Sequence, residues 1–67
     1  MTGQQPSGQN NVIFETTRIG LYMKVVAFDP VTLTEVSVQG PANARPADLQ
    51  KLAMNKLKLA VERNKKR

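Results

Sequence analysis

Residues 12–42 read VIFETTRIGLYMKVVAFDPVTLTEVSVQGPA. Three runs rich in β-branched and aromatic residues lie within this stretch: 12–18, 21–28 and 34–39. Such runs favour strands. Gly20 separates the first two runs, Asp29-Pro30 opens the break after the second, and Gly40-Pro41 ends the third. The pattern predicts three consecutive antiparallel strands joined by tight turns.

The turn lengths predict how the strands face one another. A two-residue first turn at 19–20 would place Glu15 opposite Lys24, and a four-residue second turn would place Asp29 opposite Thr34. Side chains alternate between the two faces of a sheet, so one face becomes apolar. The predicted core face consists of Val12, Phe14, Leu21, Met23, Val25, Ala27, Val36 and Val38.

Residues 46–64 have the periodicity of an amphipathic helix. Pro46 suits its first turn, and Asp48 favours the positive end of the helix dipole. Its apolar positions recur at helical spacing: Leu49, Leu52, Ala53, Leu57 and Ala60. We therefore predict an α+β fold, a three-stranded antiparallel β-meander (order 1-2-3) with one C-terminal α-helix packed on one face.

The composition indicates one small domain whose hydrophobic core alone gives only marginal stability. Residues 1–11 are polar and predict a disordered N-terminal tail, which leaves residues 12–67 as a single β-β-β-α domain. A chain of 67 residues buries only about 60% of the surface that its unfolded form exposes. Because the chain has no Cys and no His, disulfides and the usual metal sites are excluded, and a partner subunit is the remaining common remedy.

The helix covers one face of the sheet, and the second face is predicted to be an interface. Its apolar centre has a polar rim, which is typical of interaction surfaces. The predicted interface residues are Ile13, Tyr22, Val26 and Phe28. The outer strands 12–18 and 34–39 also present open edges. We expect a homo-oligomer or a protein partner bound through this face or through an edge strand.

The charge distribution supports an alternative partner. Residues 48–67 carry seven basic and two acidic side chains, which accounts for the whole net charge of +5. A basic helix of this kind is an electrostatic signal for nucleic acid. Under this alternative, a nucleic-acid-binding accessory protein, the expected contacts are Lys51, Lys58, Lys65, Lys66 and Arg67.

Lys56 stands out within the helix because it lies near the apolar positions. It can extend its ammonium group out to solvent, the interpretation that we favour, or it can meet Glu15 or Glu35 of a neighbouring subunit.

Enzyme chemistry finds no support. The serines lack a histidine base, and Glu15 and Glu35, which could share a sheet face, are separated by a strand. The four glycines form no phosphate-binding motif. We expect no enzyme activity, no cofactor, no metal and no small-molecule substrate. No signal peptide and no membrane span is evident, so we expect a cytoplasmic protein without a membrane partner.

The stretch FETTRIGLYMKVVAFDPVTLTEVSVQGPA, residues 14–42, resembles a family of small, uncharacterised bacterial proteins. The resemblance rests on the Asp-Pro-x-Thr-x-x-Glu-Val turn at 29–36, the Gly-Pro-Ala exit and the short basic helix, and it extends to about residue 63. It implies the β-β-β-α fold and no particular activity. The family pattern would place Gly, which tolerates a positive φ, where this chain has Leu33.

Overall fold

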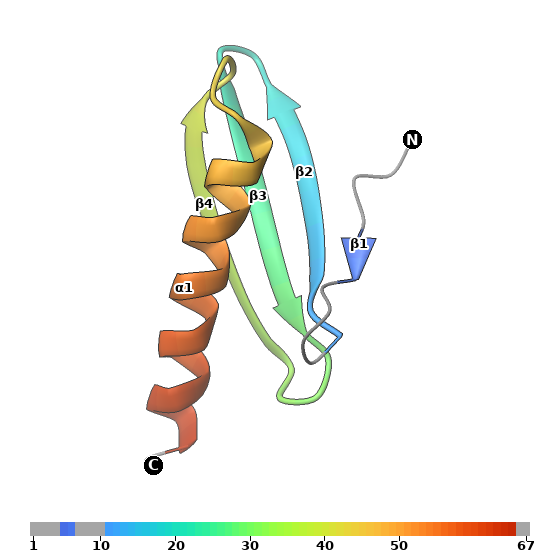
Figure 1. Cartoon of the computed structure of the whole chain (residues 1–67), viewed down its shortest axis with the longest axis vertical. Helices are drawn as coiled ribbons and strands as arrows, with labels where there is room; N and C mark the ends of the chain where they lie inside the picture. The colour runs from blue at the N-terminus through green and yellow to red at the C-terminus, as the bar shows by residue number, and fades with distance from the viewer. Residues whose placement is uncertain (1–4, 7–10, 66–67) are drawn as a thin grey trace.

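The computed structural model describes residues 5–6 and 11–65, and the side chains of residues 11–64. The elements in chain order are β1 (Gln5–Pro6), β2 (Ile13–Ile19), β3 (Tyr22–Asp29), β4 (Thr34–Pro41) and α1 (Pro46–Lys65). The strands form one antiparallel sheet in the order β1-β2-β3-β4, and α1 packs mainly on β3 and β4 (Figure 1). The predicted three-stranded meander followed by one packed helix is confirmed.

The first hairpin turns one residue later than predicted. Ile19 pairs with Tyr22, so the two-residue turn is Gly20–Leu21 and not 19–20. Gly20 has a φ of +59°, which suits the first central position of a type II′ turn. Leu21, predicted to be in the core, therefore lies in the turn and is 90% exposed.

This later turn changes the partners across β2 and β3. Glu15 lies opposite Val26, and Lys24 lies opposite Thr17. The predicted Glu15–Lys24 pair is therefore wrong. The partners have moved by two residues, and because side chains alternate with a period of two, every strand residue keeps its predicted face.

The second hairpin has the predicted register. Asp29 pairs with Thr34 across a four-residue turn. The buried carboxylate of Asp29 accepts a hydrogen bond from the backbone N–H of Val31 at 2.9 Å, which fixes the start of the turn. Leu33 ends the turn with a φ of +60°.

The core lies between the sheet and α1. Its buried residues are Val12, Phe14, Met23, Val25, Ala27, Leu49, Ala53 and Leu57, with Val36 and Val38 partly buried against them. Leu52, predicted to share this face, is 56% exposed. It lies about 100° around the helix from Ala53, which faces the strands, so it falls on a flank of α1.

Helix α1 runs antiparallel to β4. Near its start, Leu49 lies against Gly40, so close that a Cβ on Gly40 would stand 2.9 Å from Leu49 Cδ2. Near its end, Asn64 Nδ2 donates to Thr34 Oγ1 at 3.4 Å. These contacts tie both ends of the helix to the same strand.

Strand β1 was not predicted. Gln5 pairs with Phe14 and Pro6 pairs with Ile13, so β1 covers part of the outer edge of β2. The predicted disordered tail, residues 1–11, otherwise falls outside the described residues apart from Asn11.

Candidate interaction surface

The sheet face that points away from α1 is here named the open face. The pairing of β2, β3 and β4 arranges its side chains in rows across the sheet. From one end to the other, the rows are Ile13, Phe28 and Glu35; Glu15, Val26 and Ser37; Thr17, Lys24 and Gln39; and Ile19, Tyr22 and Pro41. Apolar side chains therefore gather at both ends, and the third row is polar.

The first two rows form a hollow of about 400 Å³. We name it the acid-rimmed hollow, and its lining is Ile13, Glu15, Val26, Phe28 and Glu35. The three apolar side chains are half-buried, and both glutamates are exposed. Three of the four predicted interface residues therefore line one depression.

Tyr22, the fourth predicted interface residue, lies elsewhere. It is 38% exposed and belongs to the row at the opposite end of the open face, between Ile19 and Pro41. The polar row of Thr17, Lys24 and Gln39 separates it from Val26. The predicted interface is thus divided into a hollow and a separate aromatic position.

The described charged residues that line the hollow are both acidic. Glu15 and Glu35 come from β2 and β4, on either side of β3. An apolar floor with a carboxylate on each side suits an apolar side chain that has a cationic neighbour.

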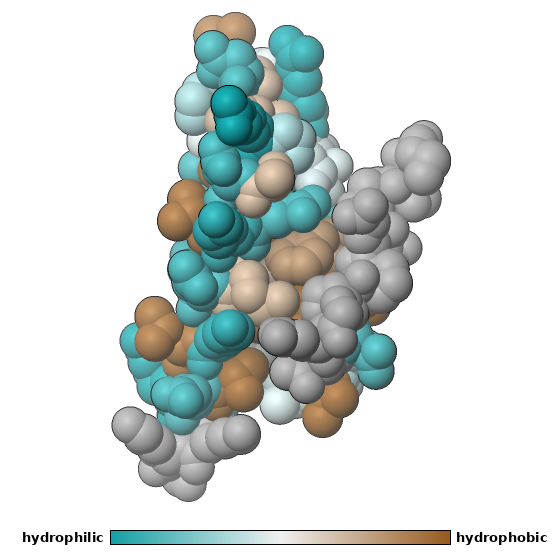
Figure 2. Space-filling model, in the orientation of Figure 1, coloured by the Kyte–Doolittle hydropathy of each residue, from teal (hydrophilic) through white to brown (hydrophobic). Residues whose placement is uncertain are grey.

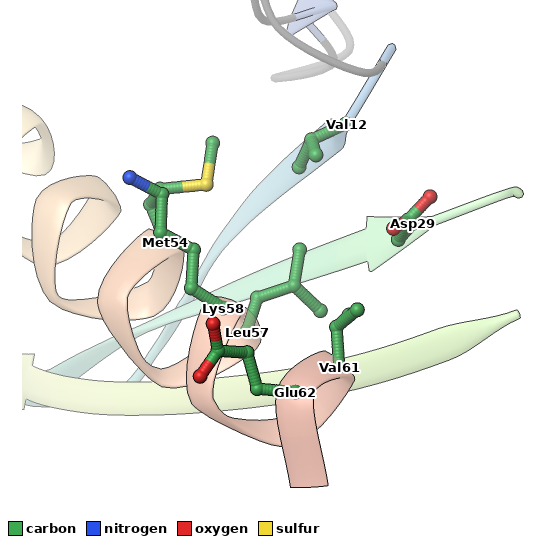
Figure 3. A pocket seen from close by; sticks show the side chains of 7 residues that line it. All are labelled: Val12, Asp29, Met54, Leu57, Lys58, Val61 and Glu62. Atoms are coloured by element: carbon green, nitrogen blue, oxygen red, sulfur yellow. The ribbon is translucent and has the colours of Figure 1, made fainter. Parts of the chain in front are cut away.

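A second hollow of about 180 Å³ lies where α1 meets the sheet (Figure 3). Its lining is Val12, Asp29, Met54, Leu57, Lys58, Val61 and Glu62. Val12 and Asp29 come from the strand side and the other five from α1. Met54 and Val61 thus belong to the flank of the helix that faces this hollow.

The described part of the chain offers no centre for a metal. Within residues 5–6 and 11–65, no three His, Cys, Asp or Glu side chains come together in a way that could hold an ion. Over the same residues, α1 is too polar to cross a membrane.

The basic residues of α1 are spread over its outer surface. Lys51 and Lys58 are exposed and lie two turns apart on α1, and the stem of Lys58 also borders the second hollow. Hydrophilic atoms dominate the outer surface of the helix (Figure 2). Lys66, Arg67 and the side chain of Lys65, the other predicted nucleic-acid contacts, fall outside the described residues.

A family model described as a domain of unknown function (DUF6898) matches residues 9–64. The chain belongs to this family. No curated protein and no solved structure matches the chain. The match agrees with the resemblance to an uncharacterised family and assigns no activity.

The matched segment of the DUF6898 domain runs from just before β2 almost to the end of α1. It therefore includes the whole open face and the acid-rimmed hollow. Strand β1, in contrast, precedes the matched segment.

Proposed function

We propose that this chain is a non-enzymatic interaction module that binds a second copy or another protein through its open face. The binding site is centred on the acid-rimmed hollow, and Ile13, Val26 and Phe28 make the apolar contacts. Tyr22 forms a separate contact at the other end of the face.

The observation that carries this proposal is the hollow itself. An apolar depression with a polar rim on an uncovered sheet face is a common form of protein-binding site. Among the described residues α1 is the one helix, and it packs on the other face of the sheet, so it does not cover Phe28. A partner seated there would add the buried apolar area that a domain of this size lacks.

Sedimentation equilibrium over a wide concentration range tests this proposal. We expect the wild-type chain to reach a mass near twice that of the monomer, and we expect Phe28→Asp to remain monomeric because it places a charge in the hollow. Leu21→Asp is the matched control, since Leu21 is exposed in a turn away from the hollow.

Association of Phe28→Asp equal to that of the wild type would reject the hollow as the interface. A wild-type mass that stays monomeric at every concentration would reject self-association. Binding would then have to be sought with a foreign protein, for which the same two variants apply.

Nucleic-acid binding is the second candidate, and the exposed Lys51 and Lys58 on the outer side of α1 favour it. Their phosphate contacts would make affinity fall steeply as salt rises. A titration with duplex and single-stranded oligonucleotides should show this slope, and joint replacement of Lys51, Lys58 and Lys65 by Gln should weaken binding. Binding that does not respond to salt would contradict this candidate.

A further inference from the structure

We infer that Lys56 prevents the edge of β4 from pairing with a second copy of this chain. Without Lys56, this edge and the neighbouring flank of α1 would form a two-fold symmetric interface between two copies. The surface is distinct from the acid-rimmed hollow, so the inference does not rest on the proposed function.

The backbone groups on the edge of β4 follow from one turn contact. Ala42 N donates to Leu21 O at 2.9 Å, which makes these two residues a hydrogen-bonded pair across β3 and β4. Hydrogen-bonded and non-hydrogen-bonded pairs alternate along an antiparallel ladder. In the register of β3 and β4, the residues that direct their backbone groups away from β3 are Glu35, Ser37, Gln39 and Pro41.

Lys56 occupies the middle of this edge. Its Nζ donates to the backbone oxygen of Ser37 at 3.0 Å, and the side chain is otherwise exposed. The favoured prediction is that the ammonium group extends away from the apolar positions of the helix. The structure adds that this group bonds to a backbone oxygen of β4. A pairing strand would have to displace this ammonium group, and lysine is a common protection of open edges.

The sequence of β4 fits pairing with itself about Ser37. A two-fold axis there would pair Ser37 with the partner's Ser37 and Glu35 with the partner's Gln39, so like charges would not meet. Pro41, which has no N–H to donate, would fall beyond this ladder. Val36 would lie opposite the partner's Val38 on the helix side of the sheet.

The position of α1 fits the same axis. Because α1 packs over β3 and β4 and strands lie about 4.8 Å apart, two helices related by this axis would stand about 10 Å apart. This is the ordinary distance between packed helices.

The flank of α1 next to the edge carries two exposed leucines and two basic residues, Lys56 and Arg63. Leu52 and Leu59 share this flank with Lys56 by helical spacing and are 56% and 62% exposed. The two-fold axis would bring Leu52 close to the partner's Leu59. The same axis would place two Lys56 ammonium groups together without a counter-charge, which opposes association.

Replacement of Lys56 tests this inference. Lys56→Met should reach at least twice the mass of the wild-type species at concentrations at which Lys58→Met matches the wild type. Lys58 is the matched control because it is an exposed lysine on the opposite flank of the same helix. Equal masses for the two variants would overturn the inference.

A single cysteine locates the contact, since the chain has no other. Under oxidation, Ser37→Cys should form far more disulfide-linked dimer with Lys56→Met than with Lys58→Met, because paired strands place facing Cα atoms within disulfide range. In the Lys56→Met background, Gln39→Pro should restore the mass of the wild-type species because it removes an outward N–H. Association that survives Gln39→Pro, or cysteine pairs that do not link, would overturn the edge as the contact.

Circular dichroism of each variant verifies that it folds. If Lys56→Met does not fold, Lys56→Gln provides the same test, because it removes the charge and adds little apolar surface. A Lys56→Gln chain that folds and keeps the mass of the wild-type species would also overturn the inference.

Discussion

At the scale of single residues, Leu33 has a backbone conformation that is unfavourable for a leucine. Its φ of +60° lies in the left-handed region, which costs a residue with a Cβ about 1–2 kcal/mol. Gly20 has nearly the same φ without that cost. The turn holds Leu33 in this conformation because Asp29 and Thr34, both buried, pair at its two ends.

Leu33→Gly should therefore raise the free energy of unfolding by about 1 kcal/mol, because glycine relieves the strained φ. Urea denaturation followed by circular dichroism measures this change. Val31→Gly is the matched control, since Val31 lies in the same turn, is also 75% exposed and has no positive φ. The control should lose stability, and a similar loss for Leu33→Gly would show that no strain is relieved.

At the scale of elements, the contact between Gly40 and Leu49 sets how closely α1 approaches β4. A Cβ at position 40 would meet two methyl carbons of Leu49, at 2.9 and 3.2 Å, and Leu49 is only 5% exposed. The leucine side chain therefore has little room to move aside. The helix packs closely against β4 at Gly40, because glycine has no side chain.

Gly40→Ala should lower the free energy of unfolding by about 1–3 kcal/mol, the usual cost of overpacking a core. Leu49→Ala should cost about 2–5 kcal/mol by itself. The double variant should lose less than the sum, because the methyl group added at position 40 then occupies space that the leucine side chain vacated. Additive losses in thermal or urea unfolding would show that the two residues do not compete for space.

The sequence predicted the elements well and the first turn less well. Alternation of side chains identified both faces of the sheet, but turns at 19–20 and 20–21 give the same faces, so alternation cannot distinguish them. The positive φ of Gly20, and with it the assignment of Leu21 to the turn, appears only in the structure. Leu52 was misplaced because i, i+3 spacing allows a residue on the flank as well as one in the core.

At the scale of the whole molecule, the open face was predictable and its geometry was not. Ile13, Val26 and Phe28 could be assigned to one face from the strand pattern alone. That Glu15 and Glu35 flank them, while Tyr22 stands apart, depends on the register of both hairpins. The bond between Lys56 and Ser37 joins residues 19 positions apart, and no local pattern predicts it.

The uneven placement of α1 over the sheet has a consequence for how the molecule opens. The helix packs mainly on β3 and β4, whereas β2 is held by its pairing with β3 and by Phe14 in the core. The segment from β3 to α1 is continuous in the chain and forms its own layered unit, so it can persist when β2 detaches. Transient fraying of β2 would then expose Phe14 and the edge of β3 that pairs with β2, while the β3–β4 hairpin beneath the helix stays intact.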